Sequence, residues 1–446
     1  MNINFLLKKG NIEKSALLWN NKFYTYQYIN DSIEYWSKQI KFEGIVEKSI
    51  VGLSGDFSPN TIAILFGLIK LDCIVVPFNY GQKDKNKNKY KIANIEFLIG
   101  VDQKDHVTFK KLTNSKNHEL YDSLINSDTA GLVMFTSGTS GVPKAAVHDL
   151  AKLLEKFRYR QKALRTINFL LFDHWGGLNT MFHVLSNGGA VIIAKDRKPE
   201  SICKLIEKYK IELLPTSPTF LNLMLLSGSY KSYDLTSLKI ISYGTEPMPE
   251  YTLKTLNKIF PQVKILQTYG LIELGVLRSK SEKNDSLWVK IGGEGYKTRI
   301  IDGILQIKAE SAMLGYLNAP SPFTEDGWFI TGDEVLQKGD YIKILGRRSE
   351  IINVGGEKVY PAEVESVIQE LDFVSDVEIY AEKNTILGNI VCAKVKINNQ
   401  SDNDDIEVKI KSYCRSKLES FKIPIKLKLV DQDIHSFRFK KIRTHI

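Results

Sequence analysis

The first 130 residues alternate short apolar runs with amphipathic stretches, which is the rhythm of parallel strands linked by helices. The pattern predicts helices over 25–40 and 59–70 and strands over 49–53 and 73–77. The charged stretch 83–91, KDKNKNKYK, is interpreted as a solvated loop or helix end. This part of the chain therefore predicts an α/β fold around a parallel sheet.

The same alternation continues beyond residue 150 and then changes. Helices are predicted over 152–160, 178–185 and 199–208, and strands over 169–172, 190–194 and 238–242. From about Gly292 the pattern becomes short strands separated by glycine turns, which indicates a β-rich lobe. After Gly346, helices (361–371, 405–418) alternate with strands (374–380, 390–397). We expect two domains, 1–348 and 349–446, the second a small α+β unit.

Composition places the chain among ordinary globular proteins. It has 446 residues, of which 43% are apolar and 25% charged, enough for a large core. Its four cysteines lie far apart, so neither structural zinc nor a disulfide framework is expected. Apolar runs are broken by charges before reaching the length of a membrane span, and no signal-peptide core follows Met1. These features predict a reduced, cytoplasmic protein without membrane insertion.

The net charge of +10 raises the question of an anionic partner. Residues 409–446 hold 11 Lys and Arg against three Asp and Glu. No helix-turn-helix pattern or aromatic RNA-binding stripe accompanies this charge, so nucleic acid is not expected. A basic surface equally suits ATP, coenzyme A or an acidic carrier protein, which Lys422, Lys426 and Lys428 would attract.

One nine-residue segment carries the strongest local signal for phosphate binding. An apolar run, 132–135, leads into it. The segment reads Thr136, Ser137, Gly138, Thr139, Ser140, Gly141, Val142, Pro143 and Lys144. Glycines let backbone N–H groups approach an anion, while hydroxyls and an ammonium group donate to its oxygens. Walker A spacing is absent, so we predict a phosphate-binding loop of another kind.

Further segments follow in an order that resembles a known family. They are 267–273 (QTYGLIE), 331–333 (TGD), 346–356 (GRRSEIINVGG), 359–365 (VYPAEVE) and 440–443 (KKIR). With the loop at 136–144, they resemble the motifs of the adenylate-forming superfamily of acyl- and aryl-CoA synthetases, nonribosomal adenylation domains, D-alanine carrier-protein ligases and beetle luciferases. The resemblance implies a large N-terminal domain with mixed sheets flanked by helices plus a β-rich lobe, and a small mobile C-terminal domain.

The resemblance also implies where the phosphates and a metal ion would bind. The loop ending in Lys144 would hold the departing pyrophosphate, and Glu273 would help to hold Mg²⁺. A single protein carboxylate suits Mg²⁺, which usually keeps waters and phosphate oxygens as its other ligands. Ile272 replaces the threonine that the family has before this glutamate, so a hydroxyl near the α-phosphate is missing.

The nucleoside would bind to residues from three of these segments and from a neighbouring strand end. Tyr269, followed by Gly270, would stack on adenine. Asp333, expected at an exposed turn, would accept both ribose hydroxyls, and Arg347 would reach ribose or phosphate. The base would be flanked by Gly244, Thr245 and Glu246.

Catalysis and domain rotation are assigned to the C-terminal part by the same resemblance. Lys441 would bridge the substrate carboxylate and the α-phosphate. Lys440 stands where the family has glycine, so the choice between the two lysines stays open, although the following Ile442 favours Lys441. Ser349 occupies the hinge position, and Gly355 and Gly356 would line the path of the thiol.

Two alignments compete for the acyl pocket. His174 and the glycines after it resemble the acyl- and aryl-CoA synthetase pattern, whereas Asp173 resembles the aspartate with which amino-acid-activating domains pair an α-ammonium group. The spacing from His174 to the glycine pair Gly188 and Gly189 favours the alignment with acyl- and aryl-CoA synthetases. Trp175, Phe182 and His183 are interpreted as packing residues.

The sequence is thus interpreted as an AMP-forming acid–thiol ligase. A small carboxylic acid and ATP, with Mg²⁺, would give an acyl-adenylate and pyrophosphate, and coenzyme A or the phosphopantetheine of an acyl carrier protein would then take the acyl group. Two alternatives remain at this point. One is an amino-acid-activating carrier-protein ligase, and the other is a nucleotide-binding protein that has lost turnover, which the departures at Ile272 and Lys440 would explain.

Overall fold

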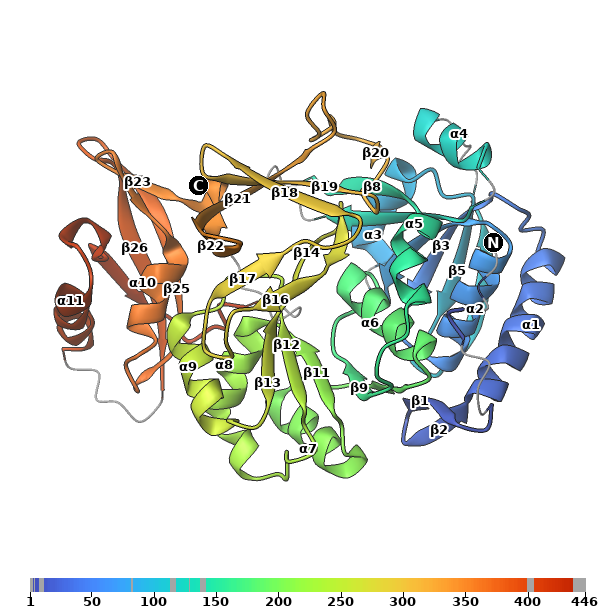
Figure 1. Cartoon of the computed structure of the whole chain (residues 1–446), viewed down its shortest axis with the longest axis horizontal. Coiled ribbons are helices and arrows are strands. Elements are labelled where there is room, and N and C mark those ends of the chain that lie inside the picture. Colours follow the sequence, from blue (N-terminus) through green and yellow to red (C-terminus); the bar gives the residue numbers. More distant parts are fainter. Residues whose placement is uncertain are drawn as a thin grey trace.

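The chain forms a large body with the C-terminal segments at one end (Figure 1). The computed structural model describes residues 3, 5–7, 12–81, 83–112, 118–127, 129–136, 142–398 and 405–435. None of the helices in these ranges is long and apolar enough to cross a membrane.

The first sheet collects strands from the N-terminal third of the chain. Its central strands are parallel and fully buried, because helices cover both faces and leave no polar side. A single distant strand, β20, is added at one edge beside β8. In spatial order the strands are β20 (Gly315–Tyr316), β8 (Lys144–Asp149), β7 (Gly131–Thr136), β4 (Ile74–Asn79), β3 (Ile50–Gly55), β5 (Phe97–Val101) and β6 (Val107–Lys111).

The second sheet lies below the first in Figure 1 and is parallel except for its β1–β2 hairpin. Its strand order places the N-terminal hairpin beside strands from residues 165–267. In spatial order the strands are β13 (Lys264–Gln267), β12 (Ile240–Tyr243), β11 (Leu213–Thr216), β9 (Arg165–Asn168), β10 (Ala190–Ile193), β1 (Ser15–Trp19) and β2 (Lys22–Thr25).

Polar side chains mark where some of the helices that flank these two sheets begin. Thr25 and Ser58 each accept a hydrogen bond from a first-turn backbone N–H, and Pro59 fits the first position of the second helix. That helix is buried on every side, which explains its lack of a polar face. The helices are α1 (Tyr26–Phe42), α2 (Pro59–Lys70), α3 (Lys83–Ile92), α4 (Glu119–Ile125), α5 (Leu150–Leu154), α6 (Trp175–Ser186), α7 (Pro199–Tyr209), α8 (Pro218–Ser227) and α9 (Glu250–Ile259), with short 3-10 turns η1 (Glu155–Arg158) and η2 (Ser229–Lys231).

An antiparallel sheet and a small hairpin connect these sheets to the rest of the chain. The hairpin is β14 (Tyr269–Leu271) and β15 (Gly275–Leu277). The sheet, gold to orange in Figure 1, has the spatial order β16 (Ser279–Ser281), β17 (Trp288–Ile291), β22 (Tyr341–Arg347), β21 (Phe329–Lys338), β19 (Ile304–Ala309) and β18 (Tyr296–Ile301).

The C-terminal segments form a separate sheet with its own apolar cluster. The turn η3 (Arg348–Glu350) leads from β22 into it. Its strands are β24 (Glu357–Val359), β23 (Ile352–Val354), β26 (Gly388–Ile397) and β25 (Val374–Asn384), with β27 (Lys426–Leu429) parallel to β26. Helices α10 (Pro361–Ile368) and α11 (Ile406–Lys417) and the turn η4 (Ser420–Lys422) complete the unit.

The predicted fold class is confirmed, and three local predictions need correction. The segment 169–172 is not a strand, because β9 ends at Asn168 and the buried Phe169 and Phe172 fill the core from a turn. Residues 83–91, predicted to be a loop or a helix end, form nearly the whole of helix α3. The antiparallel sheet begins at Ser279, ahead of the expected residue 292, because its first strands carry no glycine turns.

Helix α6 is held close to the turn that precedes it, which yields a stability prediction. A Cβ atom on Gly177 would lie 2.4 Å from the backbone oxygen of Leu171, and neither backbone can move freely. Overpacking of this kind costs about 1–3 kcal/mol. Gly177→Ala should therefore lower the free energy of unfolding, measured by chemical denaturation, by more than Gly176→Ala, whose Cβ would meet the flexible end of Leu170. Equal losses would show that α6 is not fixed by this contact.

Candidate active site

The predicted phosphate loop is closed at its base by the β7–β8 hairpin. Thr136 and Lys144 are paired across these antiparallel strands, so the ends of the loop lie side by side. Asn318 fixes the second strand, since its side chain accepts a hydrogen bond from Ala145 N at 2.9 Å and donates one to Pro143 O at 2.9 Å. Ser137, Gly138, Thr139, Ser140 and Gly141 lie outside the described residues.

Glu273 and Lys144 come together around one tyrosine. The hydroxyl of Tyr316 donates a hydrogen bond to Glu273 Oε1 at 2.5 Å, and Lys144 Nζ lies 5.4 Å from the centre of the Tyr316 ring. Strand β20 brings Tyr316 beside β8, while the Glu273 backbone oxygen accepts from Met313 N at 2.7 Å. The predicted metal-binding carboxylate and the closing lysine of the loop therefore share one site.

Asp333 lies in a second group that forms around Tyr269. The Tyr269 hydroxyl donates to Asp333 Oδ2 at 2.5 Å, and Arg347 Nε lies 3.3 Å from Asp333 Oδ1. Asp333 and Arg347 face each other across β21 and β22, so strand register sets this pair. The prediction of an exposed turn for Asp333 is wrong, because the residue sits within β21 and is only 7% exposed. Tyr269 is also buried, with its ring in the apolar cluster of the antiparallel sheet.

Electrostatic coupling joins these two groups. Burial raises the pKa of Asp333, Arg347 opposes the shift, and the Glu273 charge adds to it. Burial also raises the pKa of Tyr269 and of Tyr316, with Asp333 and Glu273 respectively adding to the effect. Both phenols therefore stay protonated and act as donors to the carboxyl groups. The site thus holds two acidic groups and two cations, Lys144 and Arg347.

The loop after β12 passes close to the start of the β14 hairpin. A Cβ atom on Gly244 would lie 2.6 Å from Thr268 Oγ1, so only glycine fits this approach. Thr245 has a positive φ of 77°, which turns the chain toward α8. Glu246 accepts a hydrogen bond from Thr219 N at 2.8 Å, at the N-terminus of that helix. The three predicted base-flanking residues therefore form one constrained loop beside Gly270 and Tyr269.

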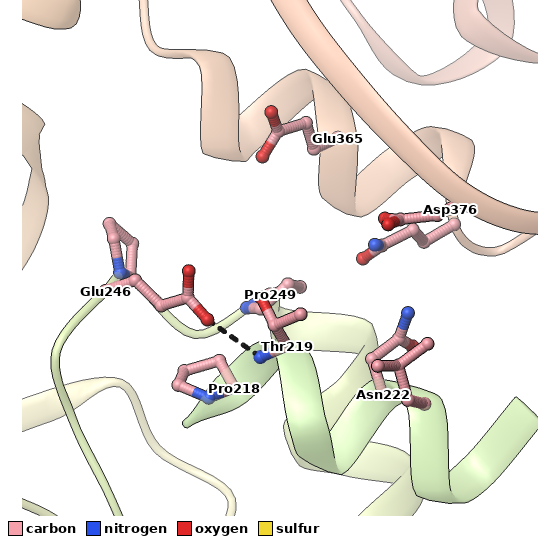
Figure 2. A pocket seen from close by; sticks show the side chains of 10 residues that line it. Pro218, Thr219, Asn222, Glu246, Pro249, Glu365 and Asp376 are labelled. Carbon is pink, nitrogen blue, oxygen red and sulfur yellow. Dashed lines mark hydrogen bonds between the residues drawn. The ribbon is translucent and has the colours of Figure 1, made fainter. Parts of the chain in front are cut away.

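A small cavity, partly open to solvent, borders this loop. Figure 2 shows Glu246, Pro249 and Thr219 on one wall and Glu365 and Asp376 on the other. The second wall belongs to α10 and β25 in the C-terminal unit. Thr219 Oγ1 and Gln369 Oε1 are buried there without a hydrogen-bond partner among the described residues.

Asp173 and His174, the candidates for the acyl pocket, lie in the turn before α6. His174 caps this helix, since its Nδ1 accepts a hydrogen bond from Gly176 N at 3.0 Å. Both residues are partly exposed. Ile272 packs against the apolar clusters on either side of the hairpin, where the family's threonine would place a hydroxyl.

The remaining predicted residues lie in the C-terminal part. Ser349 is exposed in the turn η3 between two sheets. Gly355 and Gly356 form the exposed turn of the β23–β24 hairpin, where both have positive φ angles of 60° and 97°. Lys440 and Lys441 lie outside the described residues.

Sequence reasoning missed Tyr316 and Asn318. Tyr316 lies 43 positions from the glutamate that it contacts, and no spacing rule connects the two. A tyrosine after a glycine within a short apolar run was the only local signal. Strand pairing of β20 with β8 is what brings both residues to the site.

Comparisons with known proteins show the family of the chain. A family model described as AMP-binding enzyme matches residues 8–296, and one described as AMP-binding enzyme C-terminal domain matches residues 363–438. The chain belongs to the AMP-binding enzyme family. The sequence-based predictions of an adenylate-forming family member and of an acid–thiol ligase are confirmed.

Relatives of this AMP-binding enzyme cover nearly its whole length. It is 25% identical to the 2-succinylbenzoate–CoA ligase of Listeria monocytogenes, over 96% of this chain and 95% of that protein. It is 24% identical to the indoleacetate–CoA ligase of Aromatoleum aromaticum, over 86% and 85%.

Solved structures show the same fold. An anthranilate CoA ligase in complex with anthranoyl-AMP matches with a TM-score of 0.82 at 18% identity, over 97% of this chain and 93% of that one. The o-succinylbenzoate CoA synthetase of Bacillus subtilis, in complex with its acyl-adenylate intermediate, matches with a TM-score of 0.79 at 18% identity, over 98% and 96%.

The buried Asp333 provides a test of nucleotide binding in this AMP-binding enzyme. Asp333→Asn keeps the size of the side chain but removes the charge that faces Arg347. Loss of hydrogen bonds to a charged group costs about 1.5–3 kcal/mol, so we expect ATP affinity, measured by calorimetry, to fall at least ten-fold. Asp340→Asn, at the exposed far end of the same hairpin, should leave it unchanged. Equal affinities in a folded Asp333→Asn protein would contradict the assignment.

Proposed function

We propose that this AMP-forming ligase activates a small aromatic carboxylic acid and transfers it to coenzyme A. The observation that carries the proposal is the geometry around two tyrosines. Tyr316 holds Glu273 beside Lys144 at the end of the phosphate loop, and Tyr269 holds Asp333 beside Arg347. Relatives named for aromatic acids, namely 2-succinylbenzoate, indoleacetate and 4-coumarate, support the acid class.

The groups of the site suit an attack by a carboxylate on the α-phosphorus of ATP. Both reactants are anions, so the reaction needs positive charge where the phosphorus develops charge. Lys144 would hold the departing pyrophosphate, and Arg347 would reach ribose or phosphate from beside Asp333. Lys441 would join the two reacting anions. The bond from the α-phosphorus to the bridging oxygen breaks as the acyl-adenylate forms, and pyrophosphate leaves.

Glu273 is the residue that would hold Mg²⁺. Its Oε1 accepts from Tyr316, which leaves the second carboxylate oxygen for an ion. Within the described ranges no group of three or more His, Cys, Asp or Glu could hold a metal, so the ion would arrive with ATP, bound mainly by phosphate oxygens. When bound, Mg²⁺ would stabilise charge on those oxygens.

Coenzyme A is preferred over a carrier protein as the thiol. Two of the lysines expected to attract an acidic carrier are already neutralised. Lys422 pairs with Glu363 at 2.7 Å and Glu419 at 2.9 Å, and Lys426 pairs with Glu382 at 2.5 Å. Such pairs weaken long-range attraction to an acidic surface.

Residues 349–446 would act as a lid that rotates on residues 1–348 about Ser349. In the present orientation Glu334 joins the two parts, since it contacts Lys358 Nζ at 2.6 Å and Tyr360 OH at 3.0 Å. The cavity in Figure 2 lies across the same boundary and leaves Thr219 and Gln369 with unsatisfied atoms. Stable interiors satisfy such atoms, so this polar boundary fits an interface that opens during the cycle.

The rotating lid predicts that variants separate the half-reactions. Lys441→Ala should reduce acid-dependent ATP–pyrophosphate exchange at least a hundred-fold yet still convert supplied acyl-adenylate and coenzyme A to thioester, because its charge matters only while phosphorus develops charge. Gly356→Trp should do the reverse by filling the thiol path. Ser349→Pro fixes φ near −65° and should spare only one half-reaction.

The control for these variants is Lys440→Ala, which should keep both half-reactions. Loss of exchange in Lys440→Ala alone would transfer the role to Lys440. Equal loss of both half-reactions in every variant would contradict the proposal that residues 349–446 rotate as a lid. No exchange by the wild-type enzyme with any aromatic acid would contradict the proposed substrate class.

A further inference from the structure

Two neighbouring residues of strand β21 contact different parts of the molecule. Asp333 contacts Tyr269 and Arg347, which would bind the nucleotide. The next residue, Glu334, contacts the lid. Successive side chains of a strand alternate between its two faces, so these two carboxyl groups point in opposite directions. One strand therefore touches both the proposed nucleotide site and the lid.

The contact between Glu334 and the lid is made by one carboxylate oxygen. Glu334 Oε1 accepts a hydrogen bond from Lys358 Nζ at 2.6 Å and another from Tyr360 OH at 3.0 Å. Gly346, the partner of Glu334 on β22, has no side chain that could cover this carboxylate. Both donors belong to the short segment formed by β24 and the residue after it. A single segment of the lid thus docks on a single side chain of the large domain.

The carboxylate of Glu334 depends on these two donors. Glu334 is only 7% exposed, and its Oε2 is buried without a hydrogen-bond partner among the described residues. Burial alone would raise the pKa of Glu334, but the hydrogen bonds from Lys358 and Tyr360 outweigh it, so the pKa lies below its usual value. The group is therefore charged at neutral pH, and its charge is stabilised only while the lid stays in place or water replaces the donors.

The present orientation of the lid does not suit the thiol step. Gly355 and Gly356, which would line the path of the thiol, are exposed to solvent at the β23–β24 turn. To line that path they must lie against the bound adenylate instead. Lys358 follows Gly356 by two residues, so a rotation that brings the glycines into the site would carry Lys358 away from Glu334.

We propose that Glu334 is a positioning residue that holds the lid in the orientation for adenylate formation, and that its contacts with Lys358 and Tyr360 break before the thiol step. This inference rests on the proposed function and adds the residue that sets the balance between the two lid orientations. Because Asp333 precedes Glu334 in one strand, a nucleotide bound at Asp333 steadies the surface on which the lid docks. Glu334 itself touches neither the acid nor the phosphates.

The first test compares the two half-reactions in the same variants. Acid-dependent ATP–pyrophosphate exchange is measured with 4-coumarate or indoleacetate, and thioester formation with the corresponding acyl-adenylate and coenzyme A. The ratio of thioester formation to exchange reports the ratio of the two lid populations. Glu334→Gln and Lys358→Met should each raise this ratio about five-fold, a modest effect because the Lys358 side chain is 53% exposed.

The double variant and three controls show whether the contact itself is responsible. Glu334→Gln combined with Lys358→Met should raise the ratio no more than the larger single effect, because both changes break the same contact. Lys358→Arg keeps the charge and should stay within about two-fold of the wild-type ratio. Glu325→Gln on the large domain and Lys383→Met on the lid remove charges from exposed positions and should leave the ratio unchanged.

A second measurement needs no turnover. Fluorophores attached to Asp340→Cys and Ile386→Cys, at exposed turns of the large domain and the lid, report the lid position by resonance energy transfer. The four native cysteines are buried and should not react with the dyes. Glu334→Gln should change the transfer efficiency of the nucleotide-free protein, whereas Glu325→Gln should not.

The two measurements separate failure of this inference from failure of the proposed function. Unchanged energy transfer in Glu334→Gln, an unchanged ratio, or an equal fall of both half-reactions in the folded variant would overturn the role of Glu334. Changed energy transfer in Glu334→Gln, together with a wild-type enzyme that shows no exchange, would instead contradict the proposed reaction and leave Glu334 as the residue that holds the lid.

Discussion

The site depends on holding two acidic groups, Glu273 and Asp333, close enough to interact electrostatically. Two acidic groups repel each other, and burial of Asp333 adds a desolvation cost that raises its pKa. Each is therefore held by its own phenol, Tyr316 or Tyr269, at 2.5 Å. Arg347 offsets the charge of Asp333 from the facing strand. A nucleotide with its metal ion and phosphates would complete the balance of charge.

The fold meets this constraint by joining three sheets at one point. The two large sheets supply strand ends, with Thr136 as the last residue of β7 and Gly244 directly after β12. The antiparallel sheet supplies Asp333 and Arg347 through the register of β21 and β22. Strand β20, which pairs with β8, carries Tyr316 across to Glu273. Strands and a hairpin thus position Lys144, Glu273, Asp333 and Arg347, and the proposed lid would add Lys441.

Local chemistry explains which predictions succeeded. Helix α2 begins at Pro59 and ends at Lys70 as predicted, because a serine cap, a first-position proline and an unbroken apolar run all agree. The strand predicted over 169–172 failed, since buried phenylalanines in a turn give the same apolar signal as a strand. The burial of Asp333 and the contact of Tyr316 depend on strand pairing between distant segments. Motif resemblance identified Asp333 but could not reveal its surroundings.

The most direct measurement follows the carboxylate oxygen. In the proposed reaction this oxygen attacks the α-phosphorus and stays with it when the thiol takes the acyl group. With an aromatic acid labelled with ¹⁸O in its carboxylate, ATP and coenzyme A, mass spectrometry should find one heavy oxygen in each AMP and none in pyrophosphate. Unlabelled AMP, or label in a phosphate released together with ADP, would contradict adenylate formation at this site.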